Sequence, residues 1–532
     1  ETILLTKEKR KELPGIPGQG SNVLGAAITM IPGFAIYDEN AIGGYGGASG
    51  SVTDIFNPVA ALNLFDVTSD TYQALINTYV EATFLKDFKY KLNVGATVSE
   101  FKRDNYTPRY EVGGFFKNLD NDLVHTDEFN LYTQVENTLN YTKSFGKHYV
   151  NALAGYTVYN NGFKSVVSSV SGIPDDIYVL AGAVQPAVTG YNLENNLVSY
   201  LGRAIYSYDN KYTLSATIRR DGSSRFSPEN KWGNFPSVSA AWGLGKETFF
   251  TNLNTPITDL KLRASYGVLG NQEIGDYQYL GLITSGISYG VGEPNTLWSG
   301  NIQTNSPGVG LKWESTETAD FGLDLDLWNG KVQYTFDYFN KQTSDLLLRV
   351  PIPLSVGSSE NPYTNAGNVT NKGYEMSLTY NEKIGDFNFN VTGNFSSIKN
   401  NVDELSTGSQ VLEGSRGAFH GAPITYSKVG YPIYSFFLVD TDGLFRSQAE
   451  IDAHTKNGTL IQPNAQVGDV RYVDYNGDGE INGEDRQYKG SAFPKFEYGL
   501  RLQGDWKGID CAIALQGVEG NKIYNGNNQD IA

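Results

Sequence analysis

The sequence of 532 residues has little cysteine, little histidine and no long apolar run. Its single cysteine, Cys511, excludes an intrachain disulfide and gives no information on the redox compartment. No stretch approaches the ~20 consecutive apolar residues of a membrane-spanning helix, so insertion by helices is excluded. The histidines show no i,i+4 pair or other metal-ligand spacing, and they are His125, His148, His420 and His454.

Basic residues are also few relative to acidic ones. The 41 Lys and Arg residues stand against 58 Asp and Glu residues, which gives a formal net charge of -17. Nucleic acid is a poor partner for such a surface, because its phosphates are repelled. The acidity is typical of a surface that keeps a protein soluble or that meets divalent cations.

Neither end has the features of a natural terminus. The chain begins at Glu1 without a methionine or a signal peptide, and residues 520–532 are rich in asparagine and loop-like. We therefore expect a fragment or a trimmed form of a longer protein.

Glycine and aromatic residues, by contrast, are abundant, with 59 Gly, 35 Tyr and 27 Phe. Aromatics make up 13% of a chain that is only 40% hydrophobic, which predicts strands that are apolar on one face only. With their flanking residues, most of the alternating runs reach the roughly 9–11 residues that a tilted strand needs to cross a bilayer. The clearest runs cover residues 88–94, 212–218, 321–327, 332–338, 374–380, 387–395 and 496–502.

Two kinds of connection separate these runs. Residues 328–331 carry the Asn-Gly signal of a type I′ hairpin, and residues 208–211 and 383–386 are further tight connections. The long polar connections cover residues 342–371, 396–421 and 440–492. Short turns at one end and long loops at the other are typical of an outer-membrane barrel.

The alternation fits two architectures. In a soluble sandwich the apolar face points into a core, whereas in a membrane barrel it meets lipid and the polar face lines a lumen. The apolar faces end in aromatics such as Tyr338, Tyr380 and Trp506, which suits interfacial girdles. Mid-strand Asp324 and Glu375 are costly to bury but are tolerated in a watery lumen. The sequence thus predicts an all-β transmembrane antiparallel β-barrel with long extracellular loops.

An ordered series of motifs resembles the barrel of the SusC/RagA-like TonB-dependent transporters, from about residue 57 onward. The motifs lie at residues 214–226, 230–237, 262–267, 270–272, 311–316, 371–375, 429–432 and 468–494. The resemblance implies a roughly 22-stranded barrel in the bacterial outer membrane, closed by an N-terminal plug. It also implies a SusD-like surface lipoprotein as a lid, coupling to the TonB complex through the plug, and uptake of glycans or peptides. No plug or TonB box is identifiable here, so we expect the middle and later part of such a barrel.

These patterns divide the chain into four parts. Residues 1–56 are expected to be loop-rich, and residues 57–439 to hold barrel strands with long external loops. Residues 440–493 are expected to form one long external loop, and residues 494–532 further, truncated barrel strands.

The most specific local motif is the stretch DYNGDGEINGED at residues 474–485. It places oxygen donors at positions 1, 3 and 5 of a calcium loop, a backbone carbonyl at position 7 and a closing carboxylate at position 12. The candidate ligands are Asp474, Asn476, Asp478, Glu480 and Asp485. The motif predicts a structural calcium ion that stiffens the loop. The alternative is an Asp- and Gly-rich external turn that binds no ion tightly.

Other motifs favour ordinary loops. Residues 286–290 fit the G-x-S-x-G pattern of a nucleophile elbow, but Gly292 and Pro294 follow where a helix is required. The glycine-rich residues 43–50 lack the Lys-Ser/Thr of a P-loop. No catalytic constellation can be assembled, so the chain is not expected to be an enzyme.

Aromatic loop residues are candidates for contact with a substrate, either stacking on sugar rings or packing between loops. They are Tyr289, Trp298, Phe419 and Tyr426. The expected function is TonB-dependent import of glycans or peptides across the outer membrane. The alternatives are a secreted, calcium-stabilised β-protein that binds or cleaves glycans, and a passive porin or adhesin.

Overall fold

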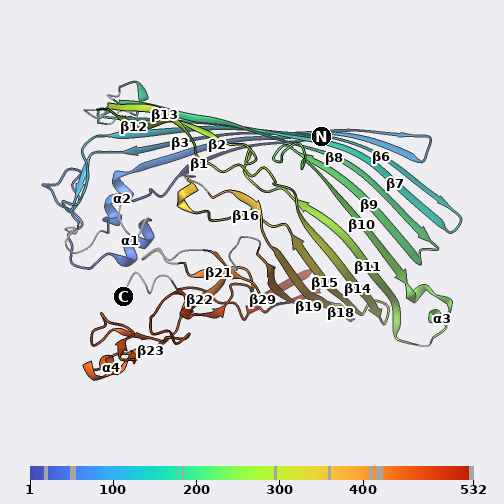
Figure 1. The fold of residues 1–532 in the computed structure, drawn as a ribbon. Helices are drawn as coiled ribbons and strands as arrows, with labels where there is room; N and C mark the ends of the chain where they lie inside the picture. Colours follow the sequence, from blue (N-terminus) through green and yellow to red (C-terminus); the bar gives the residue numbers. More distant parts are fainter. Residues whose placement is uncertain are drawn as a thin grey trace.

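The computed structural model describes residues 1–16, 22–47, 55–175, 178–182, 185–253, 255–292, 296–356, 361–405, 411–414 and 423–525. Within these residues, fifteen strands form one antiparallel sheet, and they follow one another across the sheet in chain order (Figure 1). The sheet curves into an open wall, with β1 at one edge and β29 at the other.

The strands of this sheet are β1 (Thr2–Lys11), β2 (Asp66–Phe84), β3 (Phe88–Thr107), β6 (Asp122–Phe145), β7 (His148–Ser171), β8 (Gln185–Tyr208), β9 (Tyr212–Ser223), β10 (Trp232–Gly243), β11 (Ile257–Asn271), β14 (Glu314–Leu327), β15 (Val332–Ser344), β18 (Asn368–Ile384), β19 (Phe387–Glu404), β28 (Phe496–Trp506) and β29 (Ile509–Glu519). The connections carry the short helices α1 (Val23–Thr29), α2 (Pro58–Leu64), η1 (Leu180–Gly182), η2 (Leu244–Lys246), α3 (Thr248–Thr251), η3 (Leu354–Val356), α4 (Gln448–Ala453) and η4 (Gly483–Asp485). They also carry the short strands β4 (Tyr110–Val112), β5 (Phe116–Asn118), β12 (Ile283–Val291), β13 (Thr296–Gln303), β16 (Leu347–Arg349), β17 (Tyr363–Asn365), β20 (Val411–Glu413), β21 (Thr425–Lys428), β22 (Ser435–Val439), β23 (Thr441–Leu444), β24 (Thr455–Lys456), β25 (Thr459–Leu460), β26 (Val470–Tyr472) and β27 (Arg486–Gly490).

The sheet has an apolar face and a polar face, because successive residues of a strand point to opposite sides. Two adjacent rows of cross-strand partners on β11, β14, β15 and β18 show this division. The first row is Leu262, Leu323, Phe336 and Met376, and the second is Lys261, Asp324, Thr335 and Ser377. On the apolar face, large side chains such as Leu214, Phe321 and Ile513 are 50–59% exposed. A soluble sandwich would bury this face, so the exposure favours contact with lipid.

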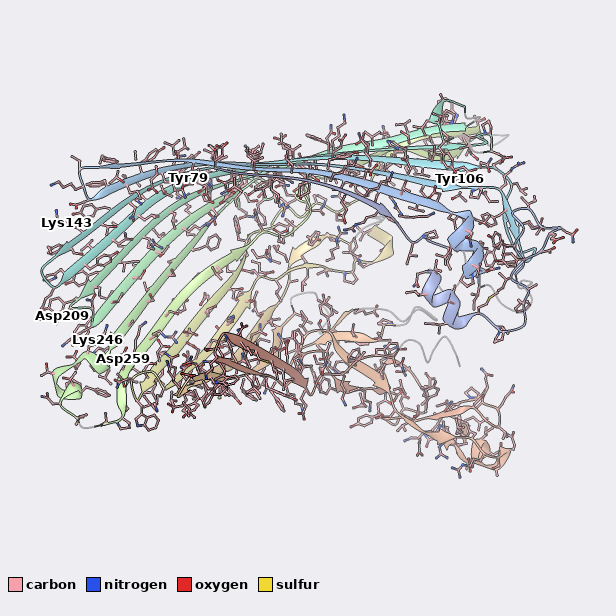
Figure 2. The ribbon with its side chains drawn as sticks, turned by 180° about the vertical axis from the view of Figure 1, so that it is seen from behind. Tyr79, Tyr106, Lys143, Asp209, Lys246 and Asp259 are labelled. Carbon is pink, nitrogen blue, oxygen red and sulfur yellow. The ribbon has the colours of Figure 1, made fainter. Side chains whose placement is uncertain are left out.

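The two ends of the sheet differ in how the strands are connected. At the turn end, six connections have two to four residues, at 85–87, 146–147, 209–211, 328–331, 385–386 and 507–508. Figure 2 shows Lys143, Asp209 and Lys246 at the turn end and Tyr106 at the opposite, loop end. The predicted hairpin at 328–331 is confirmed, since Asn329 and Gly330 have φ values of 56° and 82°.

At the loop end, the strands are longer than the alternation indicated. β15 continues to Ser344 and β18 begins at Asn368, so the connection predicted at 342–371 is shorter than expected. β19 likewise continues to Glu404 within the stretch 396–421. β1 forms within the segment 1–56 that was expected to be loop-rich, and it pairs with β2. The extensions of β15, β18 and β19 have polar or charged residues on both faces, and in β1 the apolar residues Ile3, Leu4 and Leu5 are consecutive, so alternation does not reveal these segments.

Buried apolar residues gather in small clusters rather than in one core. One cluster lies at the loop end, where residues of α1 and α2 surround Phe56, which is fully buried beside Tyr110 and Phe116. Among the described residues, no helix combines the length and apolarity that a membrane crossing requires.

Candidate functional site

On the polar face, one arginine joins three strands. Arg263 of β11 donates from Nε and Nη2 to the Asp324 carboxylate of β14, each at 3.0 Å. Its Nη1 also lies 2.9 Å from Asp337 Oδ1 of β15. Gly322 lies opposite both Arg263 and Asp337, and a Cβ there would lie 2.5 Å from Arg263 Cζ. Glycine therefore leaves the space that the guanidinium occupies.

Beside this arginine, the polar face is hollowed. The hollow has a volume of about 780 Å³ and extends from β15 to β29. Asp337 and Glu375 are direct cross-strand neighbours, an arrangement disfavoured for like charges, and Arg263 offsets it by pairing with Asp337. The other polar side chains of the lining are Thr335, Ser377, Asn394, Ser396, Glu497, Arg501 and Gln516. This lining offers donors and acceptors to a hydrated, polar solute.

Three of the motifs that carry the family resemblance, 214–226, 230–237 and 311–316, meet in a buried cluster, here called the motif hub. The ring of Trp313 lies 5.3 Å, centroid to centroid, from the rings of Phe226 and Phe235. Its indole N–H donates to the Lys231 carbonyl at 3.0 Å. The motif hub consists of Phe226, Phe235, Ile274, Leu311 and Trp313.

An ion-pair cluster adjoins the motif hub and ties two loops to the sheet. Arg225, which follows β9, donates from Nε to Asp276 at 3.0 Å and contacts Glu273 at 3.3 Å. Asn195 of β8 donates to the same Asp276 carboxylate at 3.1 Å. Sequence reasoning did not assign these contacts: Arg225 lies in the motif 214–226, but Asn195, Glu273 and Asp276 lie outside the motifs.

The predicted calcium loop, residues 474–485, lies between β26 and β27 and is closed by its own backbone. Asp474 accepts hydrogen bonds from three backbone N–H groups, and so does the fully buried Asp485. The donors to Asp474 are Gly477, Asp478 and Gly479, and the donors to Asp485 are Tyr475, Asn476 and Asn482.

The remaining candidate ligands lie on the exposed side of this loop. The N–H of Glu480 donates to Asp478 Oδ1 at 2.8 Å, and Asn476 donates to Asp478 Oδ2 at 3.0 Å. These bonds, the first above all, hold the pKa of Asp478 below its ordinary value. In the part of the chain that the structure describes, no three His, Cys, Asp or Glu side chains are grouped as a metal site. Calcium binding by this loop stays a prediction.

The prediction of an ordinary loop at residues 286–290 is wrong, because these residues lie in the strand β12. The next described element is the strand β13, whereas a nucleophile elbow requires a helix there. Residues 43–47 include Gly43 and Gly44 in left-handed turns, whereas residues 48–50 and Pro294 lie outside the described residues.

The three histidines among the described residues each have their own surroundings. His125 is 2.7 Å from Asp104, and His148 is 2.7 Å from the Tyr206 hydroxyl. His454 contacts the ring of Phe445 near α4, and His420 lies outside the described residues.

Three of the four aromatic candidates fall within the described residues, and Phe419 does not. Tyr426 packs in the loop between β19 and β28, where its ring meets Phe437 edge-on. Tyr289 and Trp298 are direct cross-strand partners on β12 and β13. They are 53% and 58% exposed, so they do not serve to fill the space between loops.

An antiparallel sheet with an exposed apolar face, a polar face, short turns and long loops defines the wall of a transmembrane β-barrel. The chain belongs to the family "TonB dependent receptor-like, beta-barrel", whose model matches residues 28–507. It is therefore an outer-membrane protein, and the predicted all-β barrel fold is confirmed.

Relatives of this chain are receptors of the same kind. It is 32% identical to the TonB-dependent receptor P3 of Formosa agariphila, over 95% of this chain and 50% of the relative. It is 28% identical to the TonB-dependent receptor SusC of Bacteroides thetaiotaomicron, over 88% of this chain and 45% of the relative. The resemblance to the SusC/RagA-like transporters is thus confirmed.

The fold matches a solved structure of the RagAB peptide transporter with a TM-score of 0.72. That match has 22% sequence identity and covers 87% of this chain and 49% of the other. The chain spans about half the length of the curated relatives it matches.

Proposed function

We propose that this chain is part of the barrel wall of a non-enzymatic importer, which takes up glycans or peptides by the TonB-dependent route. The observation that carries the proposal is the division of one continuous sheet into an apolar and a polar face, in a chain of this family. A polar face with charged groups such as Arg263 and Asp337 suits a path for hydrated solutes.

The resemblance also supplies the partners in this proposal. A SusD-like lipoprotein covers the barrel from outside, and the TonB complex supplies the energy through a plug. The long connections at the loop end provide the surface toward such a lid. The calcium ion proposed at residues 474–485 has a structural role in one of these connections.

Fractionation of cells that produce the intact protein tests the proposal first. We expect the protein in the detergent-extracted outer membrane, with a different gel mobility before and after boiling. Recovery in the soluble fraction without detergent would support the secreted, calcium-stabilised β-protein instead.

A second experiment separates active import from passive diffusion. Uptake of a labelled glycan or peptide mixture is compared in cells with and without a working TonB complex. We expect uptake to be lost without TonB, whereas equal uptake in both strains would identify a passive porin.

A further inference from the structure

The hairpin β12–β13 presents an aromatic pair that the barrel wall does not require. Ile287, Tyr289 and Val291 of β12 share one face with Trp298 and Ile302 of β13, as the register and its bulge determine. All five side chains are 45–58% exposed. Figure 1 shows both strands at the loop end of the sheet, which is opposite the end with the tight turns.

One ring of this pair lies against a glycine. A Cβ added to Gly300 would lie 2.9 Å from Cε1 and 3.2 Å from Cδ1 of Tyr289. The tyrosine ring therefore lies over Gly300, with about half of its side chain open to solvent. Trp298, directly opposite Tyr289, extends the same surface.

We infer that Tyr289 and Trp298 form a stacking platform for the rings of a neutral oligosaccharide. The C–H groups on one side of a pyranose ring carry partial positive charge, and they are attracted to the negative face of an aromatic ring. The two strands of the hairpin contain no charged residue, and Glu293, between them in the sequence, is the only charged residue of 283–303, so the face of the strands favours an uncharged ligand.

A peptide is a weaker match for this surface. Peptide recognition combines pockets for side chains with main-chain pairing or ion pairs. The platform is instead one face of a hairpin, on which Tyr289 pairs with Trp298, and Ile287 and Val291 pair with Gly300 and Thr296. The inference rests on the proposed import function and specifies glycans as its substrate class.

The test uses the intact protein, purified in detergent from outer membranes. An array of immobilised neutral α-glucans, β-glucans and xylans identifies a bound oligosaccharide, whose affinity is then measured by titration. We expect Tyr289→Ala and Trp298→Ala to weaken binding by about tenfold each, which corresponds to about 1.4 kcal/mol and lies within the range of an aromatic contact. Trp298→Phe should retain binding within about threefold, because it keeps an aromatic face.

Leu297→Ala is the matched control, because Leu297 lies on the opposite face of the same hairpin and is 73% exposed. It should bind the oligosaccharide as the wild type does. Three results would overturn the inference: no neutral glycan bound by the wild type, binding unchanged in both aromatic variants, or equal loss in the Leu297 variant. Loss of self-association or of lid binding in the Trp298 variant, with sugar binding intact, would also overturn it.

The outcome is separable from that of the import proposal. The wild type could show TonB-dependent uptake while its sugar binding does not depend on Tyr289 and Trp298. That result would overturn the stacking platform and leave the import proposal standing. Recovery of the protein in the soluble fraction would overturn the import proposal. Binding of the oligosaccharide could then still be measured with protein purified from that fraction.

Discussion

At the turn end of the sheet, neighbouring hairpins are joined by one repeated arrangement, whereas at the loop end each connection has a structure of its own. Five junctions between neighbouring hairpins at the turn end carry a lysine paired with an acid. The pairs are Lys143–Asp87, Lys147–Asp209, Lys211–Glu247, Lys331–Glu382 and Lys507–Asp386, with N–O distances of 2.7–3.5 Å. The repetition defines a rim of ion pairs between neighbouring hairpins.

The loop end replaces repetition with local clusters. The motif hub gathers residues from the connections after β9 and β11, and the connection after β19 holds the predicted calcium loop. Each surface ion pair contributes little to the free energy of unfolding, so the stability of the turn end depends on many small contributions. The loop end depends on a few buried side chains, so single substitutions should have larger effects there.

The largest effect is expected for Trp313→Ala in the motif hub. Trp313 is 8% exposed, and its truncation should lower the free energy of unfolding by about 3–5 kcal/mol. Denaturant titration of the protein in detergent measures the change. Trp328→Ala at the turn end is the control. Trp328 is 54% exposed, so its truncation should lower the free energy of unfolding much less. Equal losses in the two variants would contradict the proposed difference between the ends.

A smaller effect is expected for Gly322→Ala on the polar face. The added methyl group would overlap the Arg263 guanidinium, and overpacking of this kind costs about 1–3 kcal/mol. The shift of the unfolding midpoint measures this cost. Gly393→Ala is the matched control, because a Cβ on that barrel glycine would meet nothing within 4 Å. An unchanged midpoint for Gly322→Ala would show that Arg263 adjusts freely.

The predicted calcium loop allows a test of whether the structure of one loop-end connection depends on a bound ion. Calcium should protect residues 440–493 of the wild type from protease, and Asp474→Ala should abolish that protection. Asp452→Ala, which removes an acid from α4 in the same connection, should keep it. Cleavage that is unaffected by calcium in the wild type would reject the predicted site.

The smallest effect is expected at the turn end, for Glu247→Gln. Glu247 accepts hydrogen bonds from Tyr212, Trp242 and Lys211, and these hold its pKa below the ordinary value of 4.5. A lowered carboxyl pKa stabilises the fold above the unfolded-state pKa, and the contribution is lost as pH falls through the folded-state pKa. Unfolding midpoints measured from neutral to acidic pH should therefore fall slightly less steeply in the variant. A steeper fall would contradict this assignment.

The strands were predictable from sequence wherever lipid imposes alternation. Runs such as 321–327 and 332–338 lie inside β14 and β15, because an apolar side chain is required at every second position. The last residues of β19 have polar residues on both faces, and β1 has three consecutive apolar residues followed by mainly charged ones. Neither segment alternates, and sequence analysis therefore missed both.

The site was less predictable, because its contacts join distant residues. Phe226 and Trp313 are far apart in the chain, and no local pattern shows that their rings meet. The space that Gly322 leaves for Arg263 depends on strand register, which alternation alone does not fix. Tyr289 and Trp298 were identified as aromatic candidates, but their pairing follows from the register of the hairpin, which is already set next to its turn by the pair Val291–Thr296.

The lengths of β6, β7 and β8, with 24 residues each, determine how far the protein stands out from the cell. At ~3.4 Å per residue and a tilt of ~40°, such strands rise ~60 Å, about twice the ~30 Å hydrocarbon core. On neighbouring strands, one cross-strand row of this projecting part alternates in charge, as Lys9, Asp70, Lys102 and Asp127. This projection is open to antibodies and to reagents that cannot cross the membrane. Cysteines introduced along it would allow the protein to be labelled on living cells.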